Sequence, residues 1–204
     1  MKLYHRSDSI EAGIDEAGRG CLLGRVYAAA VIWPQENDDD YEHPIMKDSK
    51  RFSREKREEM YDYVKENAID YAFGYADEKE IDSKNILQAN YLAMHRALDK
   101  LNLDLDYIIV DGNNFKPYLD STATIIPHKC IVKGDTLYYS IAAASIIAKC
   151  EHDKYIQNLC NENPELNEKY NLLSNMGYGS KTHLEGIKEH GISKYHRKSF
   201  KCCI

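Results

Sequence analysis

The sequence lacks the features that mark membrane and secreted proteins. No apolar run among its 204 residues approaches the ~20 residues that a membrane helix requires, so we expect no transmembrane segment. The first eight residues contain no apolar stretch of the kind found in secretory signals, and we expect no such signal. The six cysteines include no C-x-x-C pair, which argues against a disulfide framework and a zinc ribbon. A reducing, cytoplasmic setting is therefore expected.

The chain also lacks the histidine spacings of common metal sites. Neither H-x-x-x-H nor H-E-x-x-H occurs among its eight histidines, which argues against a zinc role. His183, His190 and His196 follow one another at intervals of seven and six residues. We expect these three side chains on the surface of the C-terminal segment.

An excess of positive charge is absent as well. The net charge of −6 argues against a protein that coats nucleic acid by bulk attraction. Residues 36–42 hold five acids, whereas residues 179–204 hold six Lys or Arg and only two acids. A basic C-terminal segment on an otherwise acidic protein is suited to an anionic partner that contacts only this segment. Lys181 is a candidate phosphate contact. From charge alone, a solvated helix face explains this segment equally well.

Hydrophobic periodicity predicts an α/β protein with a mixed sheet. Glycines 18 and 20 separate two apolar strands. Ser53 begins a polar helix, and Ser180 caps a last helix that Gly191 closes. The predicted strands are 12–16, 26–33, 69–75, 107–110, 125–126 and 130–132, and the predicted helices are 53–65, 83–101, 136–159 and the one that follows Ser180. Strands followed by alternating strands and helices indicate a sheet flanked by helices. We expect one domain over residues 1–204, with a core to about residue 150 and a basic helical extension from about 151.

Four acids fall where carboxylates are costly to bury. Asp15 and Glu16 lie inside an apolar strand, Asp111 ends another, and Asp135 begins a helix whose first half is apolar or small nearly all round. A buried carboxylate costs several kcal/mol unless it is paired or bound to a cation. Acids that converge on strand ends therefore indicate a hard divalent cation such as Mg²⁺.

Each acid also has a structural explanation that the sequence leaves open. Asp135 fits a helix N-cap, and Asp111 with the next two residues fits a β-turn. Adjacent strand residues point to opposite faces. Glu16 therefore reaches the same ion as Asp15 only if the backbone twists at residues 17–18. In the helix 136–159, Ser145 and Lys149 are expected to serve packing, with Lys149 balancing the acids.

Motifs in order along the chain resemble the type 2 ribonucleases H, specifically the bacterial ribonuclease HII family. The resemblance begins at Gly13-Ile14-Asp15-Glu16-Ala17-Gly18-Arg19-Gly20 and covers about residues 12–200. The later motifs are Asp48-Ser49-Lys50, Val110-Asp111-Gly112-Asn113, Lys133-Gly134-Asp135, Ile141 to Lys149, Gly177-Tyr178-Gly179-Ser180, His183 and His196 to Phe200. No one of these motifs is specific, but their shared order is.

The resemblance implies a ribonuclease H-like fold and a site built from four carboxylates, those of Asp15, Glu16, Asp111 and Asp135. It implies Mg²⁺ or Mn²⁺ dependence, with two ions roughly 4 Å apart. The implied substrates are RNA–DNA hybrids and duplex DNA with embedded ribonucleotides, cut to leave 5′-phosphate and 3′-hydroxyl ends. The segment Gly18, Arg19 and Gly20, with Tyr178, is implied to read the ribose 2′-hydroxyl, which distinguishes RNA from DNA. Lys50 is a candidate phosphate contact, although a solvated loop explains it almost as well. A monomer is expected.

The chain departs from the family pattern outside the four acids. Cys21 and Arg25 stand where bacterial members usually have proline, Met176 where lysine is often found, and His152 where arginine is common. These departures bear on substrate affinity and loop rigidity. Two other functions stay open at this point: a silent hybrid-binding module, and a different nuclease on the same fold.

Overall fold

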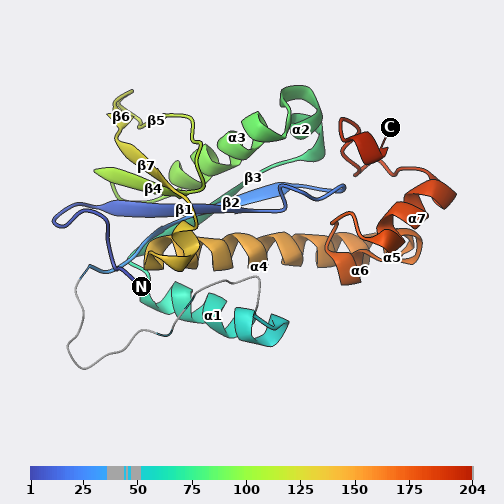
Figure 1. Ribbon diagram of the computed structural model, residues 1–204, viewed down its shortest axis with the longest axis horizontal. Coiled ribbons are helices and arrows are strands. Elements are labelled where there is room, and N and C mark those ends of the chain that lie inside the picture. Colours follow the sequence, from blue (N-terminus) through green and yellow to red (C-terminus); the bar gives the residue numbers. More distant parts are fainter. Residues whose placement is uncertain (36–43, 45, 47–51, 204) are drawn as a thin grey trace.

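The computed structural model describes residues 1–35, 44, 46 and 52–203, and its centre is a five-stranded mixed sheet (Figure 1). The strand order is β3-β2-β1-β4-β7. β1 pairs antiparallel with β2 and parallel with β4, which in turn pairs parallel with β7. The strands of this sheet are β1 (Glu11–Ala17), β2 (Val26–Ile32), β3 (Asp70–Ala76), β4 (Tyr107–Asp111) and β7 (His128–Ile131). A small hairpin pairs β5 (Tyr118–Leu119) with β6 (Ile125–Ile126).

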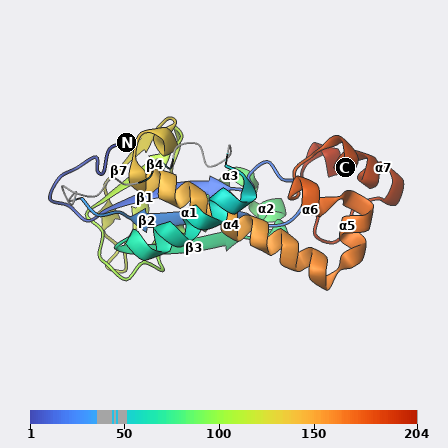
Figure 2. The same cartoon turned by 90° about the horizontal axis from the view of Figure 1, so that it is seen from below.

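Helices cover both faces of the sheet. α2 (Glu78–Lys84) and α3 (Ile86–Leu98) lie on one face, and α1 (Arg54–Asn67) and α4 (Tyr139–Glu162) lie on the other (Figures 1 and 2). The prediction of an α/β mixed sheet flanked by helices is confirmed. None of the helices in the described part of the chain combines the length and apolar character that crossing a bilayer requires.

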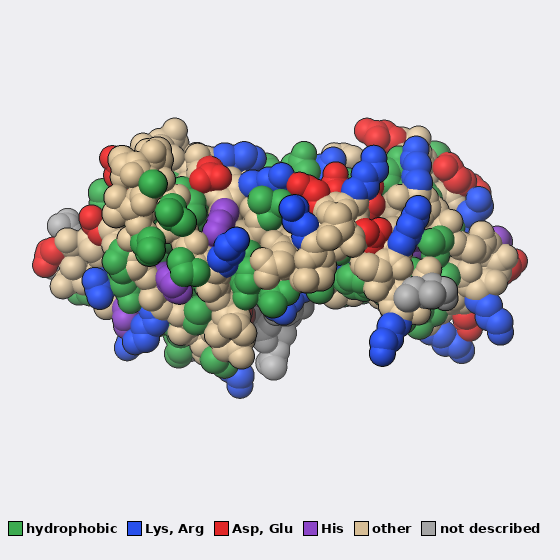
Figure 3. All heavy atoms as spheres, turned by 90° about the horizontal axis from the view of Figure 1, so that it is seen from above, with side chains coloured by type: hydrophobic (Ala, Val, Ile, Leu, Met, Phe, Trp, Pro, Cys, Tyr) green, Lys and Arg blue, Asp and Glu red, His purple; other side chains and the backbone are tan. Residues whose placement is uncertain are grey.

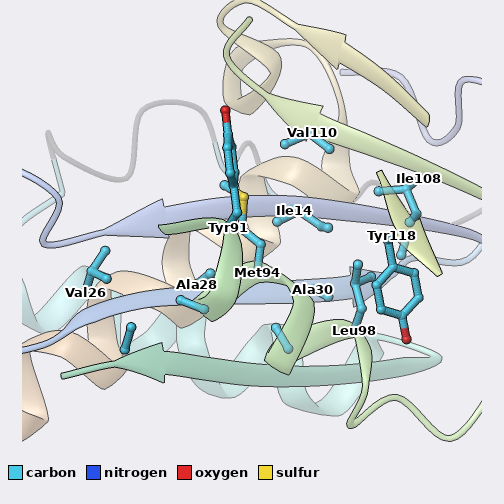
Figure 4. Close-up of a cluster of buried hydrophobic side chains, with 14 of the residues drawn as sticks. Ile14, Val26, Ala28, Ala30, Tyr91, Met94, Leu98, Ile108, Val110 and Tyr118 are labelled. Atoms are coloured by element: carbon cyan, nitrogen blue, oxygen red, sulfur yellow. The ribbon is translucent and has the colours of Figure 1, made fainter. Parts of the chain in front are cut away.

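The face under α3 holds an apolar core in which β1 contributes alternate residues. Ala12 and Ile14 are fully buried there and pack with Met94 and Leu98 of α3 (Figure 4). On the opposite side of β1, a Cβ at Gly13 would lie 2.5 Å from the main-chain nitrogen of Ile141. Glycine is therefore required for α4 to approach this strand so closely.

The C-terminal residues form a helical unit at the far end of α4. It contains α5 (Pro164–Tyr170), α6 (Leu172–Asn175) and α7 (Lys181–His190), and it lies beyond the sheet in both ribbon views (Figures 1 and 2). Leu23 from the N-terminal part packs into its apolar cluster. α4 runs without interruption through residue 150, so the predicted division into core and extension falls inside one helix. The domain boundaries stay a prediction.

Local signals located most elements, and the differences have local causes. Ser180 is the N-cap of α7 and Gly191 ends it, as predicted, and Ser53, predicted to begin a helix, is the N-cap of α1. The predicted helix 83–101 is instead two helices, because Asn85 has a φ of 69° and its side chain accepts the N–H groups that begin α3. Gly134–Thr136 is a short 3-10 turn, so α4 begins only at Tyr139. The sequence patterns did not predict α5 and α6.

The prediction that the three C-terminal histidines lie on the surface is wrong for two of them. His190 is exposed, but His183 is fully buried and His196 is 1% exposed. The Ser193 main-chain N–H can only donate, so the Nδ1 of His196 accepts it at 2.9 Å. The Nε2 of His196 then donates to the Nε2 of His183 at 3.1 Å, and the Nδ1 of His183 donates to the Tyr178 carbonyl at 2.9 Å. This hydrogen-bonded chain requires both rings to be neutral.

We predict that this histidine pair makes the fold sensitive to acid. Burial, reinforced by the neighbouring His183, lowers the pKa of His196 to about 4, and burial also lowers the pKa of His183. Between about pH 6.5 and 4 the unfolded chain therefore binds more protons than the folded chain, so the free energy of unfolding falls as pH falls. His196→Asn should lower this free energy by about 1 kcal/mol at pH 7.5 and flatten its pH dependence in that window.

Urea unfolding at a series of pH values measures both effects. The exposed His190 supplies the matched control, because His190→Asn should leave the wild-type profile unchanged. Parallel profiles for the wild type and His196→Asn between pH 6.5 and 4 would contradict the assignment.

Candidate active site

Asp15 is the most deeply buried of the four acids. Its side chain leaves β1 on the face covered by α4, where it is 4% exposed and meets the hydroxyl of Ser145. The Glu16 main-chain N–H donates to its Oδ1 at 2.7 Å. Burial, followed by the charges of Glu16 and Asp111, raises the pKa of Asp15 well above its ordinary value. Three carboxyl groups therefore lie within electrostatic reach of one another.

Glu16 points to the opposite face of the sheet, as expected for an adjacent strand residue. Its carboxylate meets the buried Asn90 of α3, and the Nη1 of Arg19 lies 3.4 Å from its Oε1. Burial raises the pKa of Glu16, and Arg19 opposes this effect. Because both residues lie near the C-terminal end of β1, the two carboxylates still interact although their side chains leave on different faces.

Asp111 and Asp135 are linked through a short turn. The Oδ1 of Asp111, at the end of β4, accepts the Gly134 main-chain N–H at 2.7 Å. Asp135, the next residue, is half-buried. The helix N-cap explanation for Asp135 is wrong, because α4 begins at Tyr139 and its N-cap is Tyr138. The chain does bend after Asp111, where Gly112 has a φ of 95°, but the Asp111 carboxylate bonds across to another loop.

The chemistry of these groups fits a hard divalent cation. All four carry carboxylate oxygens, which Mg²⁺ and Mn²⁺ accept as ligands. Among the described residues no Lys or Arg forms an ion pair with Asp15, and the Oδ1 of Asn90 is buried there with no hydrogen-bond partner. Within residues 1–35, 44, 46 and 52–203, no three Asp, Glu, His or Cys side chains stand close enough together to hold an ion as they lie. The acids are therefore assembled in one region without forming a closed cage.

A pocket of about 420 Å³ opens beside Glu16. Its walls come from β1, the following glycine segment, α1, α4 and the C-terminal unit. The lining residues are Glu16, Ala17, Gly18, Arg19, Gly20, Arg57, Ser145, Lys149 and Tyr178. The pocket therefore joins one of the acids to the predicted recognition segment and to three cationic side chains.

Two of these cations, Arg57 and Lys149, are held in place by one acid. Asp153 accepts from the Nζ of Lys149 at 2.7 Å and from the Nη1 of Arg57 at 3.4 Å. Sequence reasoning did not single out Arg57, and it assigned Lys149 only to packing and charge balance. The sequence feature that could have placed Lys149 at the pocket is its four-residue spacing from Ser145, because residues four apart share a face of α4.

The predicted recognition residues lie together at this pocket. Gly18 has a φ of 81°, and a Cβ there would lie 2.5 Å from the ring of His152. Gly20 faces Tyr178, whose ring has the Lys149 ammonium 5.4 Å from its centre. Tyr178 is 39% exposed, which leaves its ring accessible to a ligand.

The predicted lysine contact Lys181 is not among the residues that line this pocket. Lys50 lies outside the described residues. The side chain of Lys181 is 88% exposed and pairs with Glu185 on α7 at 3.8 Å. Lys and Arg side chains stand over the C-terminal end of the molecule in Figure 3, with acidic side chains among them.

Two of the departures from the family pattern contact each other beneath Tyr178. The Sγ of Cys21 lies 3.4 Å from the Nε2 of His152, and the Nδ1 of His152 lies 3.1 Å from Asp153. A cysteine, a histidine and an aspartate in contact resemble the nucleophile, base and orienting acid of a catalytic triad. Burial, however, raises the pKa of the Cys21 thiol to about 12. A neutral thiol is a poor nucleophile, so the pair fills the space under the predicted recognition segment.

Comparisons with known proteins agree along nearly the whole chain. The family model for ribonuclease HII matches residues 12–203. Ribonuclease HII of Parabacteroides distasonis is 47% identical over 197 residues, covering 97% of this chain and 92% of that protein. Ribonuclease HII of Christiangramia forsetii is 49% identical over 201 residues, covering 98% and 95%.

Solved structures share the fold. The ribonuclease H2 of Pyrococcus horikoshii superposes with a TM-score of 0.74 at 24% identity and covers 95% of this chain and 94% of that one. A ribonuclease HIII crystallised with Mn²⁺ gives a TM-score of 0.65 at 23% identity, covering 96% and 68%. The ribonuclease H family depends on divalent metal ions. The chain belongs to the ribonuclease HII family and is an endonuclease that acts on the RNA of RNA–DNA hybrids.

Proposed function

We propose that Asp15, Glu16, Asp111 and Asp135 are the catalytic carboxylates and that they hold Mg²⁺ or Mn²⁺ during cleavage. Mutual repulsion, burial and the absence of an ion pair to Asp15 among the described residues support this assignment. Bound there, two such ions would supply activation of a water molecule and stabilisation of the leaving 3′-oxygen. The products would carry a 5′-phosphate and a 3′-hydroxyl.

The protein's own groups orient these carboxylates. The hydroxyl of Ser145 and the N–H of Glu16 hold Asp15, while the N–H of Gly134 holds Asp111. Hydrogen bonds of this kind favour the charged form of a carboxylate and fix its direction. Burial opposes the charge, so the carboxylates are poised to accept a cation.

The observation that carries the recognition proposal is the pocket that joins Glu16 to the glycine segment and Tyr178. Glycine lets the backbone approach a sugar closely, and the 2′-hydroxyl is the group that distinguishes RNA from DNA. The ring of Tyr178 suits stacking on the neighbouring deoxyribose. Arg57 and Lys149, held by Asp153, suit backbone phosphates on the adjoining wall.

From this arrangement we infer that the enzyme also cuts at single ribonucleotides embedded in duplex DNA. One sugar in the pocket is enough to satisfy the recognition contacts. The four intact acids argue against a silent binding module, and dependence on a single 2′-hydroxyl would separate this enzyme from other nucleases on the same fold. A monomer and a cytoplasmic setting stay predictions.

Removing one acid tests the catalytic assignment. Asp15→Asn or Asp111→Asn should reduce cleavage by at least ~10³-fold, because several kcal/mol of transition-state stabilisation disappears with the cation. Glu16→Gln and Asp135→Asn should be impaired less completely, above all with Mn²⁺. The assay is cleavage of a duplex with one ribonucleotide, in Mg²⁺ and in chelator. The exposed Asp104 supplies the control, since Asp104→Asn removes the same charge and should leave activity unchanged.

The thermal stability of these variants without metal distinguishes catalysis from folding. Because Asp15→Asn removes a buried charge and relieves repulsion, its melting temperature should be unchanged or higher. Substantial residual cleavage in either Asp15→Asn or Asp111→Asn would overturn the assignment.

Substitutions at Tyr178 test the stacking contact. Tyr178→Phe should retain most activity, whereas Tyr178→Ala should lose about tenfold to hundredfold on a single embedded ribonucleotide, as stacking contacts are worth ~1–3 kcal/mol. Tyr4 is 40% exposed, nearly the same as Tyr178, so Tyr4→Ala is the matched control and should have no effect. Equal losses in the two Tyr178 variants would show that the hydroxyl, rather than the ring, makes the essential contact.

A salt series tests whether α7 holds duplex phosphates. In an inactive Asp111→Asn background, Lys181→Gln with Lys188→Gln should lower the slope of log Kd against log salt by about 0.9 for each phosphate that these side chains no longer neutralise. The same number of charges removed at Lys116 and Lys129, in another part of the molecule, should leave the slope nearly unchanged. Equal slopes in the α7 variant and the wild type would mean that this helix face is only solvated.

A further inference from the structure

Arg197 is a wholly buried cation whose described hydrogen-bond partners are all neutral. Its relative exposure is 0%, although the charge pattern placed it on a basic surface segment. The acceptors of its guanidinium are four main-chain carbonyls, those of Gly18 at 2.7 Å, Gly24 at 2.8 Å, Arg19 at 3.0 Å and Arg25 at 3.0 Å. Burying a charge in this way is costly, so a structural reason for it must lie in the residues that it holds.

Two of these carbonyls belong to the recognition segment. In a planar trans peptide, the C=O and the following N–H point in opposite directions, and the described chain contains no cis peptide bond. Because the carbonyls of Gly18 and Arg19 point at the guanidinium, the N–H groups of Arg19 and Gly20 point away from it. Arg19 and Gly20 are exposed and line the pocket, so these two donors lie on its side of the segment.

The chain around Arg197 is fixed from both sides. Its own main-chain N–H donates to the Leu22 carbonyl at 2.9 Å, and the Gly24 N–H donates to the Tyr195 carbonyl at 2.9 Å. Beyond Arg197, the carboxylate of Asp82 accepts the N–H groups of Lys198 and Ser199 at 3.1 and 2.9 Å. The guanidinium is therefore fixed in position, and the recognition segment is hydrogen-bonded to it.

We propose that Arg197 is a positioning residue for ribose recognition, which holds two carbonyls of the glycine segment so that the N–H groups of Arg19 and Gly20 face the sugar. The inference rests on the proposed reading of the 2′-hydroxyl at this pocket. Arginine is suited to the role because its planar guanidinium presents five donors in a fixed fork, whereas lysine has three donors on one atom. Lysine keeps the charge but cannot hold four divergent carbonyls.

The test is the discrimination between two duplexes that differ by one 2′-hydroxyl. In an inactive Asp111→Asn background, the ratio of Kd for the all-DNA duplex to Kd for the single-ribonucleotide duplex should be about tenfold, as expected for one or two hydrogen bonds. Arg197→Lys should bring this ratio close to one. Its Kd for the all-DNA duplex, which phosphate contacts determine, should stay within about twofold of the parent.

A matched variant separates positioning from general stability. Tyr170→Phe removes the 2.9 Å bond from the Tyr170 hydroxyl to the Gly191 carbonyl within the same C-terminal unit. It should lower the melting temperature and leave the discrimination ratio unchanged. Asp82→Ala keeps Arg197 but removes the acceptor of the Lys198 and Ser199 N–H groups, so it should give an intermediate ratio. If Arg197→Lys does not fold, Asp82→Ala is the variant that tests the inference.

The outcomes are distinct. If the parent discriminates between the two duplexes and Arg197→Lys shows the same ratio, the inference is overturned and the proposed ribose reading is not. If Arg197→Lys does not fold, an unchanged ratio in Asp82→Ala overturns the inference in the same way. A parent that binds both duplexes equally would overturn the proposed ribose reading and the inference with it. A fall in the ratio for Tyr170→Phe equal to that for Arg197→Lys would show a structural role only.

Discussion

The close contact between β1 and α4 is the constraint on which the site depends. At Gly13 the strand and the helix approach so closely that no side chain fits between them. Two residues further along β1, this packing encloses Asp15 against Ser145 and removes its carboxylate from water. The small residues at the start of α4, Ala142 to Ala144, make that approach possible. The electrostatic strain of the site therefore follows from how tightly the core is packed.

The sequence was informative wherever the decisive physics was local. Apolar runs separated by glycines located β1 and β2, and a long apolar stretch located α4. The helix starts at Ser53 and Ser180 were correct because a helix cap is a bond within three residues. The helix that was predicted through Asn85 shows the limit. Most of its apolar residues lie in α3, but Asn85, with a φ of 69°, separates α3 from α2.

The candidate site was predictable in part for the same reason. The acids could be singled out because carboxylates in apolar strands are costly, whatever they contact. Arg197, His183 and His196 could not be placed, because charge and polarity suggest the surface and only tertiary contacts show what holds them inside. The cationic wall formed by Arg57 and Lys149 joins residues 92 positions apart and has no sequence signature of its own.

α4 also sets the spacing between the acids of the candidate site and the C-terminal unit that carries Tyr178. Ser145, in the first half of α4, contacts the Asp15 carboxylate, and Ile156, in its second half, packs in the cluster that supports the C-terminal unit. Each helical residue adds about 1.5 Å and turns the chain by about 100°. One residue inserted between these positions would swing Tyr178 around the helix axis, away from the glycine segment it faces. The number of residues in α4 between Ser145 and Ile156 therefore sets where Tyr178 lies relative to the glycine segment.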